Sequence, residues 1–424
     1  MGKFTITIKK EKTLFLPQIL ICLLIIVIPV TSVLNSFVGG AGWIKDFICL
    51  AMCFFAIVKW RNNILLVSIC PVLYLILVVI GSMFNDNVLE SIRYRCEFAI
   101  TFALFFSAIK FTSKRKERII KSIVITIYGI GLLVAIIAVI EFFNPTVVHK
   151  IYGSNLTQHI SVIFGVNTSN RLVSTMANPI NLGLQMAISC AAALGLFFLS
   201  DKGKVEKVFF AASCLLFIWV IAFTYSRTAY LVVATIFAGF FLLQFKNVKV
   251  QKKLLILILG FILVIFLYRF ISQNTTLATR IGNINFQEFS SNTRFNRAVL
   301  AFKNSKASLL NILFGFGIGD TLGESGQYVF EFGFASLLYE SGILGIMIYA
   351  GAIIKSMFSC IYIFQQKKYT MLEKNVALTF LSIILGFCTA MVTEDVYMQL
   401  PYSMYLWMSI FMIERIKIDG CFKI

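Results

Sequence analysis

The chain has 424 residues, of which 59% are hydrophobic and only 13% are charged, and its formal net charge is +19. Soluble globular proteins carry about a quarter charged residues, so this composition excludes an ordinary soluble domain. The hydrophobic residues fall in runs of about twenty, the length at which a helix crosses a bilayer. We therefore expect an all-α, polytopic membrane protein in which residues 1–424 form a single integral membrane domain.

About twelve apolar segments are predicted to be transmembrane helices, because backbone groups inside a bilayer must find hydrogen bonds within their own segment. The basic N-terminal stretch carries no evident cleavage site, so we expect the first helix to be retained. In chain order the predicted spans cover residues 14–34, 44–59, 64–83, 97–112, 119–143, 180–200, 207–224, 228–244, 253–271, 342–364, 375–393 and 398–414.

Twelve spans put both chain termini on the same side of the membrane. Lysine and arginine accumulate in cytoplasmic connectors. If the termini are cytoplasmic, most of the 38 basic residues fall in the short connectors on that side. The positive charge is then a topology signal with some affinity for anionic membrane lipids, and it does not indicate a nucleic-acid partner. We expect both termini to be cytoplasmic.

Three of the connectors that then lie outside the cytoplasm are of interest. They are a loop at 144–179, a tight hairpin at 224–228 and a large loop at 272–341, which joins the ninth and tenth spans. The cytoplasmic connectors are too short for a nucleotide-binding domain and carry no glycine-rich phosphate loop. Chemistry is therefore expected on the extracytoplasmic side.

Arginine residues mark each of these three connectors. Arg227 sits in the hairpin, where it either snorkels to lipid headgroups or acts as a fixed cation for an anionic substrate. Arg171 lies just before a span, and a solvated loop arginine is the alternative there. Arg294 and Arg297 share the polar face of a predicted amphipathic helix at 292–310, which also suits attraction to lipid phosphate. The planar fork of arginine matches phosphate oxygens well.

Acidic residues of the large loop flank a short apolar segment. Glu331 and Glu340 are nine residues apart, so an unbroken helix would turn them to opposite faces. Gly342 and Gly345 permit close helix contact or a break at the start of the next span. Inside that span Lys355 is a lone charge, for which we expect snorkelling or pairing within the bundle.

Cysteine and histidine residues give no sign of a metal or redox site. Most of the ten cysteines lie in apolar runs and none forms a CxxC pair. The two histidines, His149 and His159, stand ten residues apart with no cysteine near them. Buried free cysteine usually acts as a small apolar packing residue. We expect no metal and no cofactor.

Four stretches in order resemble motifs of the O-antigen ligase/polymerase superfamily of lipid-linked oligosaccharide enzymes. Two features depart from the family pattern. Ser174 stands where the family often has glycine, and Glu331 stands where many ligase-type members carry histidine, which favours a repeat-unit polymerase. The similar stretches are 171–183, 226–231, the arginine-bearing helix that leads into 314–319, and 331–345.

The resemblance implies a GT-C-like glycosyltransferase in the cytoplasmic, or inner, membrane. Its substrates would be oligosaccharide repeat units linked to undecaprenyl diphosphate, which it polymerises into O-antigen, capsule or exopolysaccharide. Flippase and chain-length regulator proteins are the protein partners that the resemblance implies. Two alternatives stay open. One is a ligase that moves a finished glycan to a lipid or protein acceptor, and the other is a membrane transporter or flippase.

The same resemblance gives roles to individual residues. Arg171, Arg227, Arg294 and Arg297 would bind the diphosphate and glycan of the donor. Arg227 would also act in catalysis by stabilising the charge of the leaving group, and Glu331 would take the proton of the acceptor hydroxyl.

Overall fold

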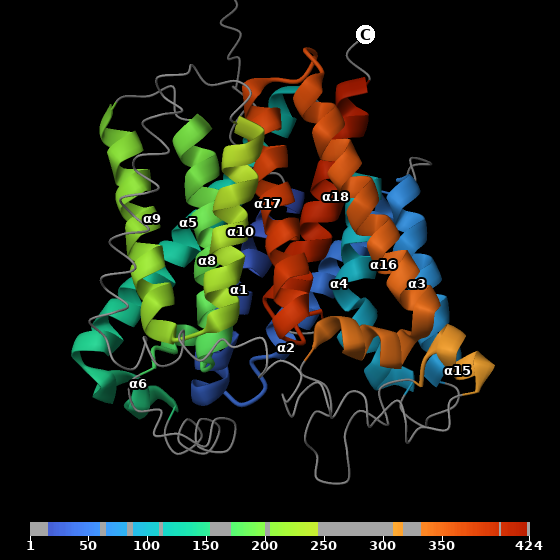
Figure 1. Cartoon of the computed structure of the whole chain (residues 1–424), viewed down its shortest axis with the longest axis horizontal. Coiled ribbons are helices and arrows are strands. Elements are labelled where there is room, and N and C mark those ends of the chain that lie inside the picture. The colour runs from blue at the N-terminus through green and yellow to red at the C-terminus, as the bar shows by residue number, and fades with distance from the viewer. Residues whose placement is uncertain are drawn as a thin grey trace, which may run out of the picture.

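A computed structural model describes residues 16–59, 65–82, 88–109, 113–152, 171–199, 204–244, 308–316, 332–397 and 400–421. Every regular element in these ranges is a helix, and the long helices form one bundle (Figure 1). The helices are α1 (Leu16–Phe37), α2 (Trp43–Val58), α3 (Ile69–Ser82), α4 (Val88–Ala108), α5 (Ser113–Phe143), α6 (Pro145–Tyr152), α8 (Pro179–Leu199), α9 (Lys204–Thr224), α10 (Arg227–Gln244), α15 (Leu309–Phe314), α16 (Gly333–Gln365), α17 (Met371–Thr393) and α18 (Tyr402–Cys421), with 3-10 turns η1 (Leu66–Ser68) and η2 (Ser174–Met176).

The expectation of a helical membrane protein is confirmed by the length and hydropathy of these helices. Within the described ranges, six helices are long and apolar enough to cross a membrane: α1, α5, α8, α9, α16 and α17. Three shorter apolar helical segments accompany them, Leu66–Gly81, Cys96–Ala108 and Arg227–Phe241. Each predicted span overlaps a helix except 253–271, which lies outside the described residues.

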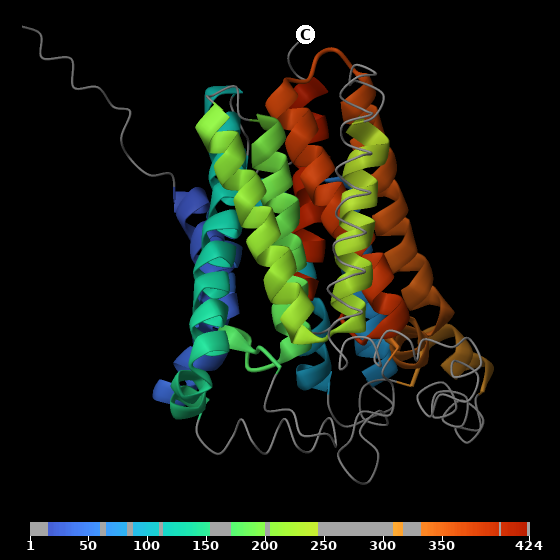
Figure 2. The same cartoon turned by 60° about the vertical axis from the view of Figure 1, so that its left-hand side comes forward.

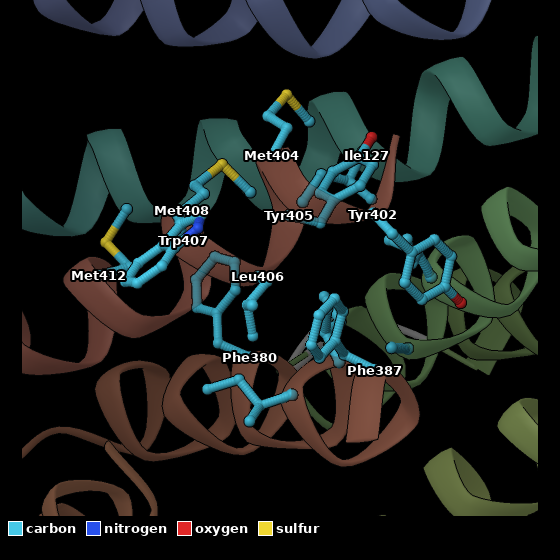
Figure 3. Close-up of a cluster of buried hydrophobic side chains, with 14 of the residues drawn as sticks. Ile127, Phe380, Phe387, Tyr402, Met404, Tyr405, Leu406, Trp407, Met408 and Met412 are labelled. Carbon is cyan, nitrogen blue, oxygen red and sulfur yellow. The ribbon is translucent and has the colours of Figure 1, made fainter. Parts of the chain in front are cut away.

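Helix α18 forms the centre of the bundle. Its Tyr405, Leu406, Trp407 and Met408 are each at most 1% exposed, although they point in successive directions around the helix. Figure 3 shows this cluster together with Ile127 of α5 and with Phe380 and Phe387 of α17. A helix that is apolar and buried on all sides belongs in the interior of a large bundle. The described helices around α18 therefore stand between it and the lipid.

The outer helices expose apolar side chains. On α2, for example, Phe47, Leu50 and Phe54 are each more than 60% exposed. In water such a face would favour aggregation, but lipid tails are as apolar as these side chains. The burial pattern therefore agrees with a bundle whose perimeter is solvated by lipid.

The two ends of the bundle differ in what they carry (Figures 1 and 2). The first end holds α6, the turn at 224–227 between α9 and α10, α15 and the first part of α16. We call it the hairpin end. The opposite end holds the last turns of α18 and the connection between α16 and α17, and we call it the C-terminal end.

Helix α16 breaks at Gly342, as the sequence permits. Gly342 has φ +66° and ψ −171°, a conformation that residues with a Cβ rarely adopt. The break separates a half-helix at 333–341 from the long part of α16, and Figure 1 shows the half-helix turned away from that long part. A Cβ on Gly342 would lie 2.3 Å from the carbonyl oxygen of Leu313, so glycine also allows α15 to pack against the break.

Residues 292–307 of the predicted amphipathic helix at 292–310 lie outside the described residues. Its predicted end differs from the structure, because Ser308 is extended, with φ −75° and ψ 163°. The Ser308 side chain accepts a hydrogen bond from the backbone N–H of Asn311 at 3.2 Å. Serine at this position caps the start of a helix. Residues 309 and 310 therefore begin α15.

Charged side chains at the C-terminal end pair with each other. Arg415 donates from Nε and Nη2 to the carboxylate of Asp419 at 3.0 and 2.8 Å, and both side chains are at most 3% exposed. Lys355 Nζ lies 3.9 Å from Oε2 of Glu414. Of the two expectations for Lys355, the structure therefore gives pairing within the bundle.

Candidate functional site

The hairpin between α9 and α10 is tightly packed, and Arg227 is its exposed member. Thr224, Ser226 and Thr228 are each at most 4% exposed, whereas Arg227 is exposed. The Ser226 side chain accepts a hydrogen bond from the backbone N–H of Ala229 at 3.3 Å, so Ser226 caps the N-terminus of α10. Arg227 is thus the first residue of a helix whose dipole favours anions at this end.

Arg171 is joined directly to this hairpin. Its Nε donates a hydrogen bond to the carbonyl of Thr224 at 2.8 Å. The backbone N–H of Leu172 donates to the carbonyl of Phe223 at 3.2 Å. These two bonds attach the Arg171 segment to the last turn of α9, three residues before Arg227. Two arginines from different connectors are therefore brought to the same corner of the hairpin end.

The segment that follows Arg171 is held by a carboxylate from another helix. Glu141, in the last turn of α5, is 7% exposed. Its Oε2 accepts hydrogen bonds from the backbone N–H groups of Val173 at 3.1 Å and of Ser174 at 2.7 Å, and its Oε1 also lies 3.1 Å from the N–H of Val173. A buried carboxylate needs such donors, because burial otherwise disfavours its charge.

Ser174 has a left-handed backbone, with φ +48°. This is a conformation that glycine adopts more readily than residues with a side chain. Two contacts secure the turn around Ser174. Its Oγ donates to the carbonyl of Val134 at 2.8 Å, and the Tyr152 hydroxyl donates to the Ser174 carbonyl at 3.0 Å. Burial raises the pKa of Tyr152 above its ordinary value, so the hydroxyl keeps the proton that it donates.

Hydrogen bonds connect the hairpin to the end of α17. The hydroxyl groups of Thr228 and Thr393 lie 2.9 Å apart. Just beyond α17, the carbonyl of Glu394 accepts from the backbone N–H of Gly333 at 3.1 Å. The hairpin end therefore links α10 to α17 and α17 to the half-helix of α16.

Asp395 adds a buried carboxylate to this junction. It is 6% exposed, and its Oδ2 accepts a hydrogen bond from the Ser336 hydroxyl at 3.0 Å. Sequence reasoning did not select Asp395 or Glu141. Both interrupt or end an apolar run on the predicted extracytoplasmic side, and this position was the signal that the sequence offered for them.

The predicted site residues are only partly within the described ranges. Arg171 and Arg227 lie together at the hairpin end. Arg294, Arg297 and Glu331 lie outside the described residues. Among the residues that the structure describes, no group of three or more histidine, cysteine, aspartate or glutamate side chains is arranged to hold a metal ion.

The described part of the site offers cationic and hydrogen-bonding chemistry. Arg227 presents a guanidinium group at the N-terminus of α10, and Arg171 presents a second one from the adjoining segment. Guanidinium groups bind phosphate oxygens through paired N–H donors, and a helix N-terminus also attracts anions. The corner is therefore suited to an anionic group such as a diphosphate.

Comparison with known proteins adds no family: no protein-family model matches this chain, and no curated protein matches it.

Proposed function

We propose that this protein is a membrane glycosyltransferase that polymerises oligosaccharide repeat units linked to undecaprenyl diphosphate into a cell-surface polysaccharide. One observation carries the proposal. Arg171 and the hairpin of Arg227 are joined by the Arg171 Nε bond to Thr224, across 53 residues of sequence. These arginines belong to two separate stretches that resemble one family, and their meeting at one corner supports a shared substrate.

The proposal includes an orientation in the membrane. The chain has twelve spans in a GT-C-like fold, with the hairpin end outside the cytoplasm and both termini inside. The short basic connector at 366–370, with Lys367 and Lys368, supports this orientation because it lies at the C-terminal end. The hairpin end then meets the outer headgroup layer of the cytoplasmic membrane, where a lipid-linked diphosphate resides.

In the proposed reaction, a hydroxyl oxygen of the acceptor repeat unit attacks the anomeric carbon of the donor glycan. The bond from that carbon to the diphosphate oxygen breaks, and its electron pair leaves with undecaprenyl diphosphate. Glu331 accepts the proton of the attacking hydroxyl. Arg171, Arg227, Arg294 and Arg297 bind the diphosphate, and Arg227 stabilises the negative charge that grows as it departs.

The test is reconstitution of the purified protein in liposomes with a lipid-linked repeat unit, followed by gel analysis of the glycan. We expect a ladder of products from the native protein. Arg227→Ala should reduce ladder formation about a hundredfold or more, the usual loss when a transition-state donor is removed. Arg171→Ala should reduce ladder formation through weaker binding of the donor. Arg118→Ala is the matched control, because Arg118 is an exposed arginine near the start of α5. An undiminished ladder in both site variants contradicts the proposal.

The same preparation separates the two alternatives. A ligase would leave the repeat unit unpolymerised and would transfer a finished glycan to a different acceptor. A transporter would move the lipid-linked unit across the liposome membrane without forming any glycosidic bond.

A further inference from the structure

We propose that Glu141 is a positioning residue of this site, which fixes the orientation of the Arg171 guanidinium group through the turn at 173–174. This inference rests on the proposed function, because it concerns how the diphosphate-binding arginine is held. Glu141 itself contacts backbone groups of the turn, so its effect on a substrate passes through Arg171.

The geometry around Glu141 is that of an anion held by successive backbone amides. Val173 has φ −124° and ψ −24°, and Ser174 has φ +48°. In a turn of this kind, where the second residue has a positive φ, consecutive N–H groups can point toward the same place and form an anion-binding concavity. The Glu141 carboxylate occupies that point, with contacts of 2.7 to 3.1 Å to the two N–H groups.

A packing role alone would not select glutamate at this place. The side chain is 7% exposed at the end of an apolar helix, where an aliphatic residue would fill the space without the cost of burying a charge. Charge is useful here because it holds the strained backbone of Ser174. The carboxylate is therefore matched to the turn and not to the surrounding apolar side chains.

The segment from Arg171 to Ser174 is held by two helices, α9 and α5. Arg171 and Leu172 bond to the end of α9, whereas Val173 and Ser174 bond to Glu141 on α5. Only Leu172 separates Arg171 from Val173, so a displacement of the turn also displaces the arginine. Without the carboxylate, the turn keeps its contacts to Val134 and Tyr152 but loses those that fix its two N–H groups.

The test compares Glu141→Ala and Glu141→Gln in the reconstituted polymerisation assay. We expect Glu141→Ala to raise KM for the lipid-linked donor about tenfold, the effect of losing one well-formed charge-assisted hydrogen bond. The value of kcat should change little, because an arginine that grips the diphosphate throughout the reaction contributes equally to both states. Glu141→Gln should fall between, since Oε2 alone accepts from both N–H groups and an amide oxygen can take its place.

Glu373 provides the matched structural control. It is a buried glutamate, 1% exposed, that accepts a hydrogen bond from the backbone N–H of Thr370 at 2.8 Å at the other end of the bundle. Glu373→Ala should lower the thermal unfolding temperature and leave KM unchanged. If Glu141→Ala and Glu141→Gln behave in this way too, Glu141 is only structural and the inference fails.

A binding measurement tests the route through Arg171. The Kd for farnesyl diphosphate, a short analogue of the lipid carrier, is measured with each purified variant. Glu141→Gln should weaken binding in the native background and have no further effect in Arg171→Ala. Equal losses in both backgrounds overturn the inference while leaving the proposed function standing. If Arg171→Ala and Arg227→Ala leave both binding and the ladder intact, the proposed function itself fails, and the role of Glu141 with it.

Discussion

The hairpin end and the C-terminal end of the bundle both carry buried charged groups, but they use them differently. At the C-terminal end oppositely charged side chains form ion pairs, as Arg415 and Asp419 do. Around the hairpin of Arg227, Glu141 accepts hydrogen bonds from two backbone N–H groups and Arg171 donates to a backbone carbonyl, while Asp395 accepts from the Ser336 hydroxyl.

The difference matters for what each end can offer a ligand. A pair of opposite charges cancels within the protein and leaves no net charge to offer a ligand. Charged groups bonded to the backbone shape a turn, and the exposed guanidinium group of Arg227 remains available beside it. The comparison therefore supports the proposal that the hairpin end, and not the C-terminal end, binds an anionic substrate.

The largest expected effect is on stability, at the C-terminal end. Arg415→Ala leaves the Asp419 carboxylate buried without its guanidinium partner, which typically costs about 3–5 kcal/mol. Thermal unfolding in detergent should show this loss, and Arg415→Ala combined with Asp419→Ala should recover most of it. Arg227→Ala, in contrast, should unfold close to the temperature of the native protein. A destabilised Arg227→Ala or an unaffected Arg415→Ala would break the comparison.

An intermediate effect is expected at the break in α16. Gly342→Ala forces a Cβ into a backbone conformation used almost only by glycine, which costs about 1–3 kcal/mol. The added Cβ would also meet the Leu313 carbonyl 2.3 Å away. Unfolding temperature and polymer length should both fall. Gly351→Ala is the control in the same helix, where no atom lies within 4 Å of an added Cβ, and it should be neutral or slightly stabilising.

The smallest effect concerns two similar hydrogen bonds between α10 and α17. Thr228 bonds to Thr393 at 2.9 Å at the hairpin end, and Thr235 bonds to Thr389 at 3.0 Å further along the same helices. Thr228→Val and Thr235→Val should each cost about 1 kcal/mol of stability. Only Thr228→Val should shorten the polymer, because it loosens the hairpin that carries Arg227. Equal effects of the two substitutions on polymer length would show that the position of Thr228 at the hairpin end does not matter for polymerisation.

Much of the helical framework could be predicted from the sequence. Apolar runs of bilayer length predict helices whatever their neighbours are, because an unpaired backbone is too costly in lipid. Glycine at 342 also permits a break, since its conformational freedom is a property of the residue itself. Both predictions depend on local chemistry alone.

The partners of charged residues could not be predicted in the same way. Glu414, Arg415 and Asp419 look like a solvated cytoplasmic tail in the sequence, yet each is at most 8% exposed. Glu141 lies 32 residues before Val173, and no local pattern joins them. The free-energy cost of burying a charge is offset only when tertiary packing brings donors and acceptors within hydrogen-bond distance.

The sequence by itself thus determined the class of the protein, the positions of its apolar helices and the arginines worth attention, because hydrophobicity and charge act at the level of the single segment. Only the tertiary structure decided that Arg171 reaches the hairpin of Arg227, that Glu141 holds the turn that follows Arg171, and that Glu414 of α18 pairs with Lys355 of α16. These outcomes depend on distances between segments that are remote in sequence, and those distances exist only once the helices have packed.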